Sequence, residues 1–433
     1  MLPRERPVLL LTATLRWPIA ARLAMAFAEH GAMIQCACPK HHPARRTRAV
    51  QGLHAYSALQ PLTSLRAAIA ASRPDLVIPC DDDAARHLQQ LHARCGPRDA
   101  GLRQLIERSL GAPDACALAA DRGALIALAV AEGVRVAPTT QLDTPAQVSE
   151  WAALRSFPAV LKTDGTWGGL GVAVVGDAEQ ARRTLAHMAA RPSLSNALVR
   201  MLLDRDATSL LTALRPGRRG VTSQEFIVGT PANRAVACWR GRVLAGISVM
   251  ALHTQHATGP ATLVRIIDHP EMASGVARLV GRLGLSGFWG VDFMLDENGA
   301  AHLIEVNPRA TPITHLVGRD GQNLAAALLA CLTGLAPIAA GARIDNETVA
   351  LFPGEWRRDA ASPHLFAAHH DVPWGEPALV QELARRPWSE RGWIARLWER
   401  LRPQAATPGT RGLCSPSNRR YTRRNAKNAS LGA

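Results

Sequence analysis

A glycine-rich segment carries one of the three lysines of this chain. Residues 158–172 read PAVLKTDGTWGGLGV, so an apolar strand delivers Lys162 to a loop with four glycines. Glycines let backbone N–H groups approach phosphate oxygens, and a lysine places a compact positive charge on a phosphate. A flexible β-turn would have a similar composition. The lysine favours phosphate binding, because 47 of the 50 basic residues of this chain are arginine.

A second segment combines acidic residues with an asparagine. Residues 287–309 read GFWGVDFMLDENGAAHLIEVNPR, and the Asn-Gly pair between two apolar runs predicts a β-hairpin. The hairpin places Asp292 and Glu305 on neighbouring strands, and Glu305 and Asn307 point to one face. Two carboxylates and an amide oxygen suit Mg²⁺. The alternative is a surface strand with unrelated acids, but Glu305 lies in an otherwise apolar run.

The elements that must position these residues follow an alternating pattern over residues 7–110. Apolar runs predict strands, helical periodicity predicts helices, and their alternation predicts a parallel sheet with helices on both faces. The predicted strands are 7–12, 32–38 and 74–79, and the predicted helices are 18–30, 65–72 and 84–93. No GxGxxG follows the first strand, so the usual dinucleotide fingerprint is missing.

Later segments predict a mixed architecture. A helical pattern covers 117–132, which is one long predicted helix, and a shorter one covers 148–154. The predicted strands beyond the glycine loop are 222–228, 234–240, 242–250, 287–295 and 301–306, and the predicted helices are 178–190, 270–284 and 321–333.

The net positive charge comes from two regions of the chain, the C-terminal tail and the remainder. The net charge of +15 suggests nucleic acid as a partner, but seven of the basic residues lie in 402–433, which contains no acid. That segment has the composition of a disordered tail, and the remainder mixes arginine with acidic residues. Nucleic-acid binding through the tail is kept as an alternative.

Cysteine usage and hydropathy limit the class of protein. The eight cysteines include no CxxC pair, so we expect reduced, mostly buried thiols and a cytoplasmic protein. The chain has no run of eighteen apolar residues, so we expect no membrane span.

Other polar residues are weaker candidates. Thr14 and Arg16 follow the first predicted strand and could border a ligand at its carboxyl end. The acids at 81–83 either cap the following helix, which we favour, or contact a substrate amine. His253 and His256 either face an acceptor or are ordinary loop residues, which is the more common situation.

The two chemical segments together resemble the ATP-grasp superfamily, in the manner of carbamoyl-phosphate synthetase large subunits and carboxylate–amine ligases. The resemblance covers about residues 7–335, and the ExNPR motif with its upstream Asp is the most specific part. Two segments depart from it: 191–222 is longer than the usual connection, and 341–400 matches nothing with an assigned role.

The resemblance implies roles for individual residues. The nucleotide would be bound by the lid loop, the basic member of the Asp121-Arg122 pair and the hinge strand, namely Arg122, Lys162, Thr166, Gly168, Gly169, Gly171, Gln224, Glu225, Phe226 and Ile227. The metal ligands would be Asp292, Glu305 and Asn307. Arg309 and Lys162 would be the catalytic residues.

The resemblance also implies an architecture. We expect an α/β protein with a pre-ATP-grasp parallel-sheet domain, a two-lobed α+β ATP-grasp domain and a small C-terminal extension. The expected ranges are 1–114 for the first domain, 115–340 for the ATP-grasp domain with its lid at about 138–222, 341–400 for the extension and 401–433 for a disordered basic tail.

The implied activity is an ADP-forming ligase reaction. With ATP and Mg²⁺, or Mn²⁺ in its place, a carboxylate would become an acyl phosphate that an amine or thiol then attacks. The partners would be small-molecule carboxylates and amines, and a homodimer is one assembly we consider. The alternative enzyme forms carboxyphosphate, as in carbamoyl-phosphate synthetase or biotin carboxylase.

Overall fold

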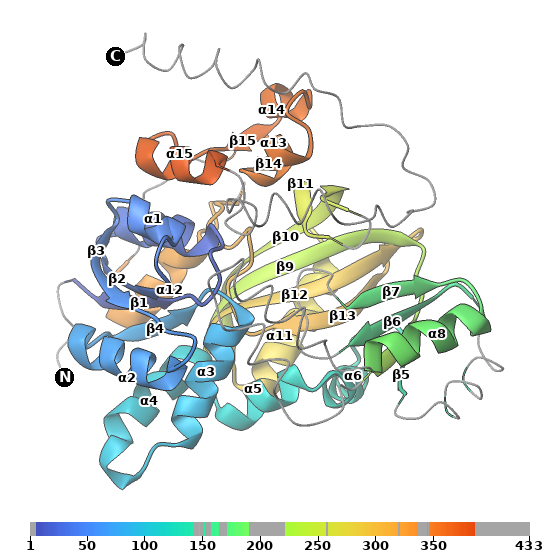
Figure 1. Ribbon diagram of the computed structural model, residues 1–433, viewed down its shortest axis with the longest axis horizontal. Coiled ribbons are helices and arrows are strands. Elements are labelled where there is room, and N and C mark those ends of the chain that lie inside the picture. The colour runs from blue at the N-terminus through green and yellow to red at the C-terminus, as the bar shows by residue number, and fades with distance from the viewer. Residues whose placement is uncertain are drawn as a thin grey trace.

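The computed structural model describes residues 6–142, 147, 151, 157–163, 171–189, 221–256, 259–318, 321–336, 344 and 346–385. These residues form three β-sheets and the helices that pack on them (Figure 1). The predicted α/β class is confirmed, since a parallel sheet comes first along the chain and two largely antiparallel sheets follow. Three segments lie largely or wholly outside the described residues: the predicted helix at 148–154 apart from Trp151, most of 191–222, and the basic tail.

The N-terminal unit is a parallel sheet in the order β3-β2-β1-β4. Its strands are β1 (Val8–Thr12), β2 (Met33–Cys38), β3 (Val50–Ala55) and β4 (Leu76–Pro79). Its helices are α1 (Ile19–Glu29), α2 (Pro61–Ser72), α3 (Asp82–Ala93) and α4 (Ala100–Leu110). The sequence pattern does not predict β3, because this edge strand alternates partly buried with exposed residues and lacks an apolar run.

The prediction of one long helix over 117–132 is wrong. The chain forms α5 (Pro113–Ala120) and α6 (Arg122–Ala131), which are separated by Asp121 in an extended conformation. The Asp121 carboxylate accepts a hydrogen bond from the Ala124 N–H at 3.0 Å and so caps α6. Arg122 is therefore the first residue of a helix.

The smallest sheet has the order β5-β8-β6-β7 and is antiparallel. It contains β5 (Thr139–Gln141), β6 (Ala159–Thr163), β7 (Val172–Val175) and β8 (Val221–Glu225), with α8 (Ala178–Ala189) against it. The predicted strand 222–228 thus ends earlier, at Glu225. This sheet has its own small core, which includes Leu161, Val175 and Leu185.

The largest sheet has the order β13-β12-β9-β10-β11-β14-β15. The body strands are β9 (Gly229–Trp239), β10 (Arg242–Thr254), β11 (Ala261–Ile267), β12 (Gly287–Asp296) and β13 (Ala301–Asn307). The helices α11 (Pro270–Leu283) and α12 (Leu324–Thr333) pack on opposite faces, because alternate residues of β9 contact each.

The C-terminal segment extends this sheet. β14 (Thr348–Leu351) pairs with β11, and β15 (His369–Asp371) pairs with β14. The helices of the segment are α13 (Gly354–Arg358), α14 (His364–Ala367) and α15 (Pro377–Ala384). Its acids also bind the N-terminal unit: buried Glu376 accepts a hydrogen bond from the Thr47 hydroxyl at 3.2 Å. The segment is therefore fixed to both the large sheet and the N-terminal unit.

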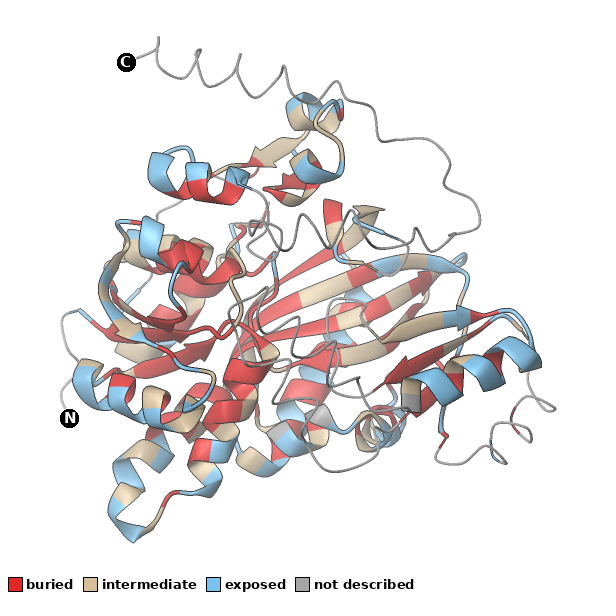
Figure 2. Cartoon of the chain, in the orientation of Figure 1, coloured by how far each residue is buried: buried red, intermediate tan, exposed pale blue. Residues whose placement is uncertain are grey.

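The N-terminal and large sheets share a continuous core. Buried residues run along β9, β10 and β12 and along the inner faces of the helices (Figure 2). Phe27 of α1 packs against Phe288 of β12 with ring centroids 5.7 Å apart. The two units are therefore packed against each other, and this packing brings α3 close to the site described below.

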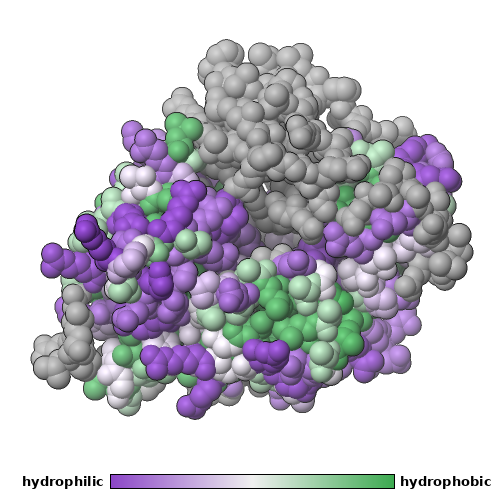
Figure 3. Space-filling view, turned by 90° about the horizontal axis from the view of Figure 1, so that it is seen from below, coloured by the Kyte–Doolittle hydropathy of each residue, from purple (hydrophilic) through white to green (hydrophobic). Residues whose placement is uncertain are grey.

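The surface seen from below has an apolar area among hydrophilic side chains (Figure 3). Among the six cysteines whose side chains are described, none forms a disulfide and five are buried. Within the same residues, no helix has both the length and the apolar character needed to cross a bilayer.

Candidate active site

The predicted hairpin places two carboxylates side by side. Asp292 of β12 lies directly opposite Glu305 of β13, as the Asn-Gly turn predicts. On its other side Asp292 faces Asn233 of β9, whose side-chain amide donates to Oδ1 at 2.6 Å. Burial, together with the neighbouring charge of Glu305, raises the pKa of Asp292 to about 7. The two carboxylates therefore repel each other in a setting that a cation would stabilise.

Glu305 differs from Asp292 because cations surround it. Burial alone would raise its pKa, but the charges of Lys162, Arg122 and Arg309 lower it below its ordinary value. The Arg122 guanidinium donates to Glu305 Oε2 at 3.4 Å. Glu305 is therefore ionised at neutral pH, next to a carboxyl group that titrates close to neutrality.

Lys162 enters the same site from the smallest sheet. It lies on β6 opposite Thr222 of β8 and is 7% exposed. Arg122 donates to the Thr222 hydroxyl at 3.3 Å, so the first residue of α6 joins this sheet to β13. Burial lowers the pKa of Lys162 to about 8, and the charges of Glu305 and Asp292 oppose that effect. An anion bound next to such a buried lysine would stabilise its charged form strongly.

Arg309 is fixed by contacts from three directions. Its Nε donates to Asp82 Oδ2 of α3 at 2.8 Å, and its Nη2 donates to Asn307 Oδ1 at 3.2 Å. The guanidinium carbon lies 5.2 Å from the ring centroid of Trp17. Asn307 also donates from Nδ2 to Asp292 Oδ2 at 2.8 Å. Arg309 and the carboxylate pair thus belong to one hydrogen-bonded group.

The segment after β8 connects the two lobes. Gln224 is buried and donates to the Thr139 hydroxyl at 3.1 Å, whereas Glu225 is exposed. Within the described part of the chain, residues 226–228, which include Phe226 and Ile227, make no backbone–backbone hydrogen bond. β9 then starts at Gly229, where a Cβ atom would lie 2.0 Å from the Leu295 carbonyl oxygen. This connection therefore comes into close backbone contact with β12 at Gly229.

Only one end of the glycine loop is described. Gly171 has a φ of +80°, which glycine adopts without strain, and its carbonyl accepts from the Thr163 N–H at 2.9 Å. Thr166, Gly168 and Gly169 lie outside the described residues. The structure therefore shows where the loop leaves β6 and enters β7.

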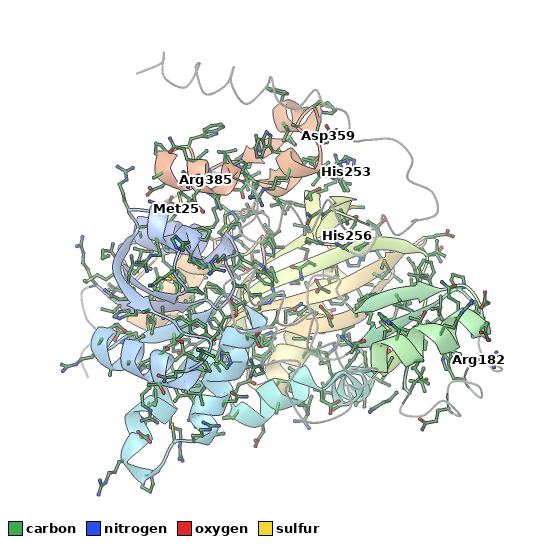
Figure 4. All side chains as sticks on the ribbon, viewed as in Figure 1. Met25, Arg182, His253, His256, Asp359 and Arg385 are labelled. Atoms are coloured by element: carbon green, nitrogen blue, oxygen red, sulfur yellow. The ribbon has the colours of Figure 1, made fainter. Side chains whose placement is uncertain are left out.

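Two weaker predictions are resolved. Asp81 accepts from the Ala84 N–H at 2.8 Å and so caps α3, as we favoured. Asp82, in contrast, reaches Arg309. His253 and His256 lie on the side of the large sheet that faces the C-terminal segment (Figure 4). His253 contacts buried Glu355 of α13 at 3.3 Å, so it belongs to the packing of that segment.

Sequence reasoning missed three residues of the site. Asn233 is a partly buried residue of β9 that stands just before the predicted strand 234–240, where no sequence pattern marks it. Trp17 lies in the loop after β1, and Asp82 was considered only as a helix cap or an amine contact. These residues lie far along the chain from the ExNPR motif, so the sequence does not relate them to it; only the fold brings them together.

The donor set fits a hard cation bound next to phosphates. The two facing carboxylates supply oxygen ligands, and their mutual repulsion favours a divalent ion between them. Among the described residues no group of three or more His, Cys, Asp and Glu side chains has metal-binding geometry. A cation at this site would therefore complete its coordination with the Asn307 amide, water or phosphate oxygens.

Comparison with known proteins assigns a family model to part of the chain. Residues 137–312 match the model of a family described as "ATP-grasp domain". That range contains Lys162, the hinge connection and all three proposed metal ligands. No curated protein sequence matches the chain significantly.

Solved structures share the fold at low sequence identity. N5-carboxyaminoimidazole synthase from Aspergillus clavatus, in complex with ADP and 5-aminoimidazole ribonucleotide, is 14% identical with a TM-score of 0.57, over 79% of this chain and 80% of that one. The Staphylococcus aureus N5-carboxyaminoimidazole synthetase complexed with ADP is 12% identical with a TM-score of 0.54, over 78% and 80%. The biotin carboxylase domain of Hydrogenobacter thermophilus 2-oxoglutarate carboxylase is 15% identical with a TM-score of 0.55, over 79% and 71%.

Proposed function

We propose that this chain, whose residues 137–312 match the ATP-grasp family model, is an ATP-dependent ligase that forms an acyl phosphate from a carboxylate and ATP. An amine, or a thiol, then displaces the phosphate. The main support for this proposal is that Lys162 and Arg122 lie beside the Asp292–Glu305 pair, on elements from both lobes. Cations for phosphates and carboxylates for a metal therefore lie in one place.

The nucleotide would lie between the two lobes. The backbone of 226–228, which makes no backbone–backbone hydrogen bond to another described residue, would offer an N–H and a carbonyl to the adenine edge, and Glu225 would bind the ribose. Lys162 and Arg122 would bind the phosphates, and the glycine loop with Thr166, Gly168, Gly169 and Gly171 would cover them. The low pKa of Lys162 supports this placement, because phosphate charge would stabilise its protonated form.

Asp292, Glu305 and Asn307 would hold Mg²⁺, or Mn²⁺. When bound, the ion supplies positive charge to the phosphates and lowers the repulsion between the transferred group and its attacker. The chain itself must then orient the reactants. Asn233 holds the Asp292 carboxylate at 2.6 Å, and Asn307 holds its second oxygen at 2.8 Å.

Phosphoryl transfer depends mainly on position and charge. The substrate carboxylate would attack the γ-phosphorus of ATP, ADP would leave, and Lys162 with Arg122 would neutralise the charge on the transferred group. Arg309 would bind the carboxylate and later the acyl phosphate through a bidentate contact. The mechanism needs no covalent bond to the protein.

A second candidate takes bicarbonate as the acid and forms carboxyphosphate. Its support is the fold shared with the biotin carboxylase domain, whose structure contains MgADP and bicarbonate. A sequence identity of 15% supports a shared fold but not a shared substrate. Bicarbonate is therefore included as one substrate in the test below.

The test measures ADP release by the purified protein with a panel of amino acids, other small acids, amines, thiols and bicarbonate. We expect turnover that needs one acid and one acceptor, and turnover with bicarbonate alone would favour the second candidate. Lys162→Ala should abolish ADP release, whereas Lys40→Ala, at an exposed lysine, should not change it. No turnover with any pair, despite Mg-ATP binding, would refute the ligase proposal.

The tail alternative has its own test. Binding of DNA or RNA that weakens with salt, and that disappears on deletion of residues 402–433, would add a nucleic-acid partner. Sedimentation of the same protein would test the homodimer.

A further inference from the structure

An ion pair between two units of the fold holds the arginine of the candidate site. Arg309 follows β13, whereas Asp82 belongs to α3 of the N-terminal unit, 227 residues earlier in the chain. Nε of Arg309 lies 2.8 Å from Asp82 Oδ2, and the two side chains are 11% and 30% exposed. The pair is thus partly shielded from water, where an ion pair has more effect than on an open surface.

The contacts of Arg309 leave donors for a ligand. A guanidinium has five N–H donors. Within the described residues three hydrogen bonds use them, from Nε to Asp82, from Nη2 to Asn307 and from Nη1 to the Ala310 carbonyl at 3.3 Å. The ring of Trp17 covers one face of the group. Among the described residues one N–H of each Nη atom has no hydrogen-bond partner, so both Nη atoms can still donate to an oxyanion.

Asp82 is itself held in a defined place. Its neighbour Asp81 is fully buried, and it accepts from the Thr14 N–H at 2.6 Å and from the Ala84 N–H at 2.8 Å. Asp81 therefore anchors the start of α3 to the end of β1 and provides the cap. The Asp82 carboxylate is not needed for capping, and it lies in the first helical turn, where the helix dipole favours a negative charge.

We propose that Asp82 is a positioning residue that holds Arg309 ready to bind the oxyanion formed in the reaction. This inference rests on the proposed function and extends it, because it makes the N-terminal unit part of the active site. Asp82 accepts from Nε, so the guanidinium cannot rotate, and its two remaining donors keep one direction. Without this acceptor the side chain still has its charge but loses its orientation.

The experiment uses inorganic phosphate as a probe, so it needs no knowledge of the substrate. Phosphate is titrated calorimetrically into the full-length protein saturated with Mg-ADP. We expect Asp82→Ala to weaken phosphate binding about tenfold, the usual effect of one hydrogen bond to a charged group. Asp82→Asn keeps an acceptor for Nε and should restore most of the affinity. Mg-ADP binding should be unchanged in both variants.

A double variant separates positioning from a general structural role. If Asp82 acts through Arg309, then Asp82→Ala has no further effect on phosphate binding once Arg309→Ala is present. Asp99→Ala is the matched control, because it removes an ion pair of 2.7 Å with Arg66 on the surface of the same unit. We expect that control to bind phosphate as the unaltered protein does.

Each contrary result has a separate meaning. The positioning role is refuted if Asp82→Ala binds phosphate as tightly as the unaltered protein, or if its loss adds to that of Arg309→Ala. It is also refuted if Mg-ADP binds but phosphate does not, or if Arg309→Ala leaves phosphate binding intact. Failure of the unaltered protein to bind Mg-ADP would instead refute the proposed function.

Discussion

Replacing Lys162 by methionine should stabilise the protein while it removes nucleotide binding. Methionine has a similar length and no charge, and Lys162 is buried at 7% exposure. Burial lowers the pKa of this lysine from 10.5 to about 8. At 1.36 kcal/mol per pKa unit, the folded protein carries a cost of about 3 kcal/mol for the charged form. That cost already includes the attraction of Glu305, so removing the charge should recover much of it.

The pH dependence of the free energy of unfolding provides a second test of this stabilising effect. The folded pKa lies below the unfolded one, so between about pH 8 and 10.5 the unfolded chain binds more protons than the folded protein. The stability of the unaltered protein therefore rises with pH in this window through Lys162. The advantage of Lys162→Met should be full below pH 8, fall by about 1.4 kcal/mol per pH unit above it, and vanish near pH 10.5.

Urea unfolding at pH 7, 9 and 10.5 measures the difference, and calorimetry measures Mg-ATP binding. We expect Lys162→Met to bind Mg-ATP at least about tenfold more weakly, because a charged contact with phosphate is lost. Lys40→Met, at an exposed position, should change neither quantity. If Lys162→Met is no more stable at pH 7, burial does not act on this lysine as we describe. Normal Mg-ATP affinity in the same variant would remove Lys162 from the site.

Three further variants test the supports of the site. Asn233→Ala removes the 2.6 Å hydrogen bond to Asp292 and should raise the Mg²⁺ concentration needed for half-maximal ADP release about tenfold or more; an unchanged Mg²⁺ dependence would contradict the role of Asn233. Asp371→Asn leaves partly buried Arg22 without its ion pair and should lower the free energy of unfolding by about 3 kcal/mol in urea, whereas a loss below about 1 kcal/mol would contradict the importance of this pair. Gly229→Ala brings a Cβ atom within 2.0 Å of a carbonyl oxygen and should cost about 1–3 kcal/mol in thermal unfolding; an unchanged transition would show that the strand moves freely there.

The local parts of the site could be predicted from the sequence. The Asn-Gly pair predicts the hairpin and so places Asp292 and Glu305 on neighbouring strands. Their direct pairing also depends on a β-bulge between Asp292 and Phe293, which shifts the register by one residue. The resemblance to ATP-grasp proteins rests on short motifs of this kind, and it agrees with the family model that matches residues 137–312. Lys162 at the end of a strand likewise needs only a strand and its loop.

The non-local parts could not be predicted. Asn233 lies 59 residues before Asp292, and Asp82 lies 227 residues before Arg309. No turn or periodicity relates such positions, since their contact depends on how the sheets pack. The break at Asp121 is different, because an aspartate three residues before Ala124 is a helix-cap signal that the apolar run obscures.

Charge balance explains why a costly lysine is retained at this place. Without ligands, the cations neutralise the acids: Arg122 contacts Glu305, and Arg309 contacts Asp82. Lys162 and Asp292 are the exceptions, because the opposite charges near them do not offset their burial. Arrival of a nucleotide with its metal ion would exchange these partners, with phosphates on the cations and the ion on the carboxylates, so no buried charge stays unpaired. The site is therefore least stable when it is empty, and the free energy held there can contribute to nucleotide affinity.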